Sequence, residues 1–69
     1  MEWTHADQTE AMSMGYLVAD IDGSGKLEIQ RYDDNPCGFK SDAEALEFVK
    51  LAAAFGNDLE IRALKTCGL

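Results

Sequence analysis

The stretch that decides the fold is GYLVADIDGSGKLEIQRYDD, residues 15–34. Two apolar-rich segments flank the tetrapeptide Asp-Gly-Ser-Gly at 22–25, and short glycine-containing loops between such segments are typical of a β-hairpin. The same letters also match the start of a calcium-binding EF-hand loop, in which side-chain oxygens alternate before a glycine. The sequence therefore offers a choice between a hairpin turn and a metal-binding loop.

Strand register favours the hairpin, with a three-residue loop at 23–25 and strands over about residues 16–22 and 26–33. In this register Asp22 faces Lys26, and Asp20 faces Glu28. One face then carries an apolar set that we expect to face the core: Leu17, Ala19, Ile21, Leu27 and Ile29. The other face carries a mixed set that we expect in solvent: Tyr16, Val18, Asp20, Asp22, Lys26, Glu28, Gln30 and Tyr32.

The metal alternative rests on Asp20, Asp22 and Ser24, which match the first three side-chain ligand positions of a calcium loop. The position that normally supplies a bidentate glutamate is Arg31, which brings a cation in place of two oxygen ligands. The residues before Asp20 also favour a strand, whereas an EF-hand needs an entering helix. We therefore expect no metal and no cofactor, and calcium binding by a degenerate loop stays the alternative.

Helices are expected on both sides of the hairpin. Capping-type spacing, at Thr4 with Asp7 or at Asp7 with Glu10, predicts a short N-terminal helix, which Gly15 stops. Ser41 and Glu44 fit a capping box, in which the Ser41 hydroxyl accepts from the Glu44 amide and Glu44 reaches back to the cap, at the start of a second helix over 41–55. Its expected apolar stripe is Ala45, Phe48, Val49, Ala52 and Phe55. The tail at 58–66 fits a short helix or a third strand. The fold class is therefore α+β, as a single small domain over residues 1–69.

Charge narrows the classes of partner. Thirteen acidic residues against six Lys and Arg give a net charge of −7, with no Lys or Arg before Lys26. Nucleic acids and anionic membranes both select positive charge, so direct binding to either is not expected. A basic protein surface fits, and simple solubility is the alternative explanation.

The remaining chemistry is sparse. His5 is the single histidine, with no nucleophile identifiable as its partner, so we expect no enzyme. The sequence has no membrane-length apolar run and no signal-peptide pattern, and so predicts a cytoplasmic protein. Cys37 and Cys67 lack metal-ligand spacing and are expected as free thiols in a reducing compartment.

Three stretches carry a resemblance: WTHADQTEA, then GYLVADIDGSGKLEIQRYDD, then FKSDAEALEFVKLAAAFGNDLEIRAL. Together they resemble small uncharacterised proteins encoded by phages, prophages and other mobile elements of Gram-negative bacteria. Tyr16 stands where tryptophan is commoner in that group. The resemblance implies a helical tail. It implies no activity, because its motifs are structural.

These observations lead to one functional hypothesis: a non-enzymatic phage or mobile-element accessory protein that binds and modulates a host protein. Its specific form is an inhibitor of a nucleic-acid-binding or defence complex. The residues expected to bind the partner are Tyr16, Asp20, Asp22, Glu28, Tyr32, Asp33 and Asp34. The alternative from another class is a structural homodimer formed through exposed hairpin edges.

Overall fold

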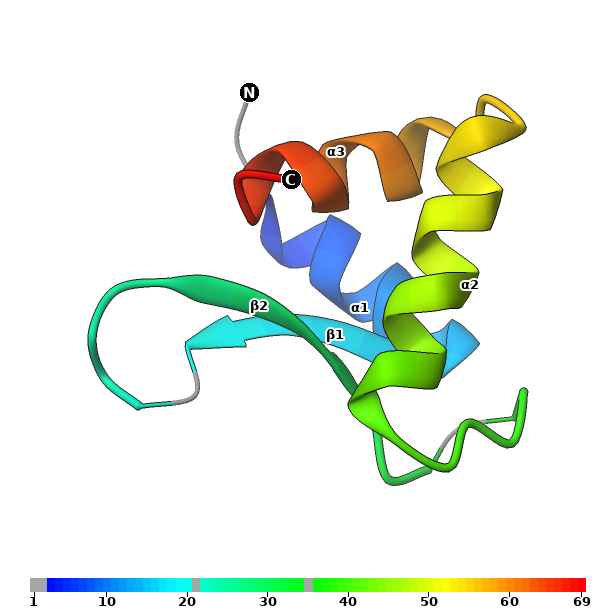
Figure 1. The fold of residues 1–69 in the computed structure, drawn as a ribbon, viewed down its shortest axis with the longest axis horizontal. Helices are drawn as coiled ribbons and strands as arrows, with labels where there is room; N and C mark the ends of the chain where they lie inside the picture. The colour runs from blue at the N-terminus through cyan, green and yellow to red at the C-terminus, as the bar shows by residue number, and fades with distance from the viewer. Residues whose placement is uncertain (1–2, 21, 35) are drawn as a thin grey trace.

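The computed structural model describes residues 3–20, 22–34 and 36–69 and shows an α+β fold (Figure 1). The elements follow one another as α1 (His5–Met14), β1 (Tyr16–Asp20), β2 (Leu27–Arg31), α2 (Asp42–Ala54) and α3 (Asp58–Thr66). The two strands form an antiparallel pair. The predicted order of a helix, a hairpin and a capped helix is confirmed. The tail is a helix, so the alternative of a third strand is wrong.

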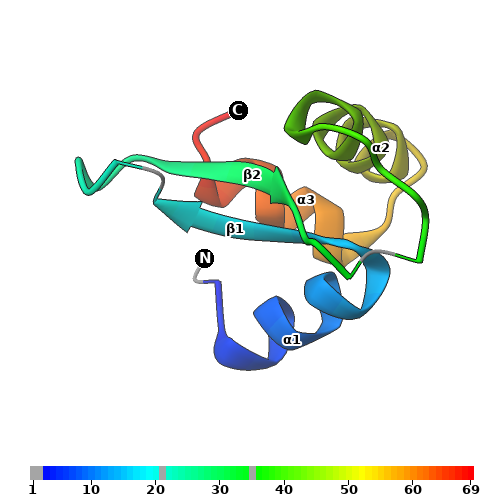
Figure 2. The same cartoon turned by 90° about the horizontal axis from the view of Figure 1, so that it is seen from below.

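The three helices surround the hairpin unequally. Figure 2 shows α1 on the β1 side of the sheet and α2 on the β2 side, with α3 behind both strands. The side chains between these elements form one core, built from Ala11, Tyr16, Val18, Ile29, Ala45, Val49, Leu59 and Ala63. The sheet face turned away from α3 is therefore left without a helix of the described chain over it (Figure 2).

The capping residues of α1 and α2 lie where the sequence predicts them. Thr4 and Asp7 form the expected reciprocal capping box, and Gly15 ends α1 with a φ of 111°. Because φ is positive there, a residue with a Cβ would be strained at this position. The Ser41 hydroxyl accepts a hydrogen bond from the Glu44 amide, as predicted. The Glu44 carboxylate instead accepts from the amide of Lys40, one residue before the cap.

The apolar stripe of α2 is correct except at its end. Ala45, Val49 and Ala52 are buried, and Phe48 packs at the edge of the core with ring centroids 6.1 Å from Tyr16. Phe55 is 80% exposed, so its predicted place in the core is wrong. It caps the helix at the corner where the chain turns into α3, and that corner lies at the periphery of the fold (Figure 1).

The strand register differs from the prediction by one residue. Val18 pairs with Ile29, and Glu28 lies opposite Ala19 and not opposite Asp20. Tyr16 and Val18 are buried, whereas Leu17 is half-exposed on the open face. The prediction for β1 is therefore inverted, because a shift of one residue moves every side chain to the other face. The inward placement predicted for Leu27 and Ile29 is correct, and Ile21 lies outside the described residues.

The cause of the shift is the loop between the strands. β1 ends at Asp20 and β2 begins at Leu27, so the predicted three-residue turn is wrong. The Asp20 carboxylate accepts hydrogen bonds from the amides of Gly23 at 2.8 Å and Gly25 at 2.7 Å, and a longer one from Asp22. A side chain thus closes a wider loop, and the expected pairing of Asp22 with Lys26 does not form in the ladder.

Candidate functional site

The residues expected to bind a partner fall into three places. Asp20 ends β1 and Asp22 lies in the hairpin loop that follows, and both are exposed. Glu28 and Tyr32 belong to the open face of the sheet, which also carries Leu17, Ala19 and Gln30. Asp33 and Asp34 follow directly in the exposed connection between β2 and α2. Six of the seven residues are thus at least partly accessible.

Tyr16 is the exception, and its predicted place on a binding surface is wrong. Its side chain is fully buried, and its hydroxyl donates a hydrogen bond to the carboxylate of Glu60 in α3. Burial, followed by this hydrogen bond, raises the pKa of Tyr16 far above its ordinary value of 10.0. Glu60 is itself only 2% exposed. Sequence reasoning missed Glu60, because nothing in the local sequence of 58–66 marks this glutamate as buried.

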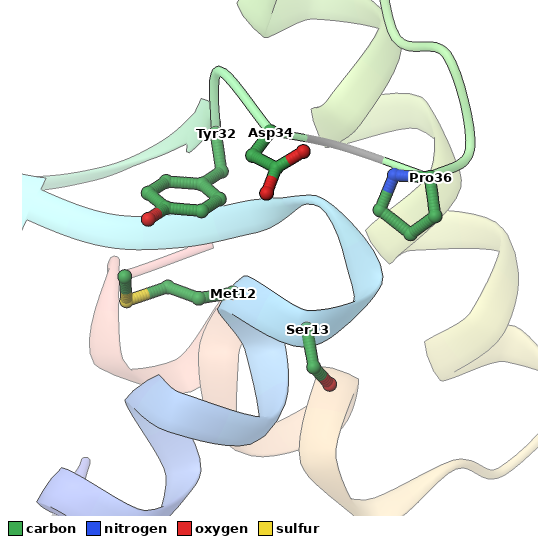
Figure 3. A pocket seen from close by; sticks show the side chains of 5 residues that line it. All are labelled: Met12, Ser13, Tyr32, Asp34 and Pro36. Atoms are coloured by element: carbon green, nitrogen blue, oxygen red, sulfur yellow. The ribbon is translucent and has the colours of Figure 1, made fainter.

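One concave surface that includes two of the predicted residues lies beside the last turns of α1. It is an open hollow of about 370 Å³, lined by Met12, Ser13, Tyr32, Asp34 and Pro36 (Figure 3). We call it the Tyr32 hollow. In Figure 3 the Asp34 carboxylate stands between the Tyr32 ring and Pro36, and the Met12 side chain extends below the ring. The hollow therefore combines an aromatic ring, a thioether and an exposed carboxylate.

Arg31 makes several contacts with the connection between β2 and α2, which forms one wall of this hollow. Its backbone amide donates to the Asp42 carboxylate at 2.9 Å, and its guanidinium donates to the carbonyl of Phe39 at 3.1 Å. The same guanidinium lies 3.5 Å from a carboxylate oxygen of Asp33, whose side chain is 98% exposed. Such an exposed ion pair contributes little stability. Asp34 makes no ion pair within the described part of the chain, so its charge is open to a partner.

Side-chain oxygens in the hairpin loop accept hydrogen bonds from backbone amides of the same loop. Asp22 accepts from the Ser24 amide at 3.0 Å, and hydrogen bonds from the side chain and backbone of Ser24 lower the pKa of the Asp22 carboxyl. The Ser24 hydroxyl accepts from the Lys26 amide. The described residues contain no group of three or more His, Cys, Asp or Glu that could hold a metal ion. Calcium binding by Asp20, Asp22 and Ser24 stays an untested alternative.

The two thiols have different surroundings. Cys37 is exposed in the connection before α2, and Cys67 is half-buried at the end of α3, and both are free. Burial raises the pKa of the Cys67 thiol, with a smaller contribution from Glu28. A thiol whose pKa is raised is a poor nucleophile, because the thiolate is the reactive form.

Comparison with known protein families, curated proteins and solved structures gives no match to this chain. Among the described residues, no helix is both long enough and apolar enough to cross a membrane.

Proposed function

We propose that this chain is a phage or mobile-element accessory protein that binds a basic surface of a host protein and modulates that protein without catalysing a reaction. The observation that carries the proposal is the Tyr32 hollow, in which Tyr32 and Asp34 meet in a protein with a net charge of −7. The adjoining carboxylate of Asp33 lies almost wholly in solvent. A concave aromatic surface with acidic neighbours suits a lysine or arginine side chain.

The lining residues suggest how such a side chain binds. Its aliphatic stem would pack on Met12 and Pro36, while its cationic head would reach the Asp34 carboxylate and the face of the Tyr32 ring. A hollow of about 370 Å³ lies within the range of small ligand sites. The half-exposed Leu17 and Ala19 on the open sheet face would extend the contact beyond this anchor.

The acidic charge favours a particular kind of host target. Grooves that bind nucleic acid are lined with Lys and Arg, which pair with phosphates. An acidic protein that occupies such a groove excludes the nucleic acid by competing for the same cations. The specific form of the proposal is therefore an inhibitor of a nucleic-acid-binding or defence complex in a bacterial host cytoplasm.

Both edges of the sheet bear on the homodimer alternative. The side-chain amide of Gln8 bonds to the outer edge of β1 at Val18, and the Asp42 carboxylate takes the Arg31 amide at the outer edge of β2. These contacts occupy the Val18 groups of one edge and the Arg31 amide of the other, which makes both edges poorer templates for strand pairing between chains. A host partner is thus better supported than an edge-to-edge homodimer.

Matched charge reversals test the proposal. Affinity capture from lysate of a Gram-negative host would compare the natural chain with Asp34→Lys and with Glu47→Lys, an exposed position on α2. Each variant changes the net charge from −7 to −5. We expect Asp34→Lys to lose a captured protein with a basic surface, and Glu47→Lys to retain it. Equal loss of capture in the two variants would mean that the net charge alone controls binding. Retention of the captured protein by both variants would contradict the proposal.

A further inference from the structure

The outer edge of β1 is closed by a side chain in place of a strand. The side-chain nitrogen of Gln8 donates to the Val18 carbonyl at 2.9 Å, and Oε1 of Gln8 accepts from the Val18 amide at 3.1 Å. In an antiparallel sheet, one residue of a neighbouring strand makes this same pair of hydrogen bonds. The edge of β1 therefore has the geometry that receives another strand, and Gln8 occupies its middle residue.

The direction of the backbone groups makes this edge complementary to itself. The Gly15 carbonyl accepts from the Tyr32 amide on the β2 side of the strand, whereas the groups of Val18 point the other way. Because alternate residues of a strand direct these groups to the same edge, those of Tyr16 and Asp20 share the outer edge with Val18. A two-fold axis at Val18 would then place Val18 opposite its own copy, and Tyr16 opposite Asp20.

The side chains of β1 suit the same two-fold pairing. Leu17 and Ala19 are half-exposed on the open face, and the axis would put Leu17 of each copy opposite Ala19 of the other. Apolar cross-strand pairs of this kind stabilise a sheet. Asp20 is the only charged residue of β1, and it would lie opposite Tyr16, so no like charges would face one another along the paired strands.

α1 blocks this pairing, and its hold on the rest of the fold is limited. Figure 2 shows α1 along the β1 side of the sheet, away from α2. Of the ten residues of α1, Ala11 is the only buried one. Besides Gln8, Asp7 anchors the helix by accepting hydrogen bonds from Arg62 in α3. Gly15 is the single residue between α1 and β1, and a glycine at a hinge absorbs backbone rotation readily.

We propose that the outer edge of β1 is a latent dimer interface, at which Gln8 and α1 occupy the place of β1 from a second copy of this chain. When α1 turns away at Gly15, the two edges pair about an axis at Val18 and form a four-stranded antiparallel sheet. While Gln8 is seated the chain stays monomeric, since a covered edge is a poor template for a strand. The interface involves neither the Tyr32 hollow nor a host protein.

Sedimentation of the pure chain over a range of concentrations tests this interface. The natural chain is expected to be largely monomeric. Gln8→Ala removes two hydrogen bonds per chain and is expected to raise the dimerisation constant about 100-fold. Asp7→Asn keeps Gln8 but loosens α1, and is expected to raise the constant about fivefold even if Gln8→Ala folds poorly. Gln30→Ala, the same substitution on the open face, is the control and should leave the chain monomeric.

Hydrogen exchange identifies the edge that pairs. In Gln8→Ala the Val18 amide should exchange quickly in dilute solution and regain protection at high concentration, because β1 of a second copy replaces the lost acceptor. Protection of the Gln30 amide, which faces Leu17 within the ladder, reports that the variant is folded.

Several outcomes would overturn the proposal. They are unchanged dimerisation in both Gln8→Ala and Asp7→Asn, equal dimerisation in Gln8→Ala and Gln30→Ala, and protection of Val18 that does not depend on concentration. Oligomers larger than a dimer would indicate pairing of β1 with the β2 edge and would contradict the two-fold arrangement. Capture of a host protein by a monomeric Gln8→Ala chain would assign the edge to a strand of that protein and would equally contradict pairing between copies.

Discussion

The side chain of Gln8 pairs with the backbone of Val18 as a third strand would. Its amide nitrogen donates to the Val18 carbonyl at 2.9 Å, and its Oε1 accepts from the Val18 amide at 3.1 Å. The indole of Trp3 donates to the same Oε1 at 2.8 Å. A single residue of α1 thus satisfies both Val18 groups at the outer edge of β1 and joins the segment before α1 to the hairpin. Buried or edge backbone groups that lose such partners are costly.

Gln8→Ala is therefore expected to lower the free energy of unfolding by about 1–3 kcal/mol, because both backbone groups of Val18 lose their partner. The measurement is urea unfolding followed by the fluorescence of Trp3, the only tryptophan. Gln30→Ala is the matched control on the open face and should stay within about 0.5 kcal/mol of the natural chain. Equal effects of the two substitutions would contradict a specific role for the Gln8 pairing.

Tyr16→Phe should destabilise the fold by about 1–3 kcal/mol, because Glu60 would lose the hydroxyl that donates to it. The pH dependence supplies a second test. Since the folded pKa of Tyr16 is raised above 10.0, its proton stays bound in the folded chain while the unfolded chain releases it. Stability from this group is complete below about pH 10 and declines as pH rises further. Urea unfolding at pH 9 and pH 11 should show a smaller decline in Tyr16→Phe than in the natural chain.

The contribution of Asp7 to stability depends on pH at the acidic end, whereas that of Tyr16 depends on pH at the alkaline end. Hydrogen bonds from Arg62, then from the Thr4 backbone, hold the pKa of the Asp7 carboxyl below its ordinary value of 3.8. A lowered folded pKa means that its stabilising contribution is present above about pH 4 and is lost as pH falls through the folded value. Arg62→Gln should move the Asp7 pKa back towards 3.8. Carboxyl ¹³C titration measures this shift directly, and an unchanged Asp7 pKa would contradict the assigned cause.

Asp20→Ala should loosen the hairpin loop without unfolding the domain. The carboxylate accepts from three loop amides, at Asp22, Gly23 and Gly25, and all three lie at an exposed position where water can replace it. The expected loss of stability is therefore below about 1.5 kcal/mol. Hydrogen exchange should accelerate at Gly23 and Gly25 and stay unchanged at Gln30, whose amide faces Leu17 within the ladder. Asp33→Ala, in the other acidic segment, is the control and should leave loop exchange as it is.

The sequence by itself determined α1 and α2, because capping and termination are local, whereas it left the tail at 58–66 between a helix and a strand. Thr4 with Asp7, and Ser41 with Glu44, lie within one turn of the helices that they begin, and Gly15 ends α1 through its own backbone freedom. The sequence also placed Tyr32 on the outer face of the second strand and Asp34 in the connection, and both are accessible. It could not supply Met12 or Pro36, the lining residues of the Tyr32 hollow that come from α1 and from further along the connection.

Only the tertiary structure decided which way β1 faces. The apolar alternation of Leu17, Ala19 and Ile21 was a reasonable guide, yet the buried residues are Tyr16 and Val18. Tyr16 turns inward, where Glu60, 44 positions away in sequence, accepts a hydrogen bond from its hydroxyl, and Gln8 binds the β1 edge at Val18. The loop closed by Asp20 allows the one-residue shift that this requires. Strand register thus depended on partners that no local pattern of residues 15–34 contains.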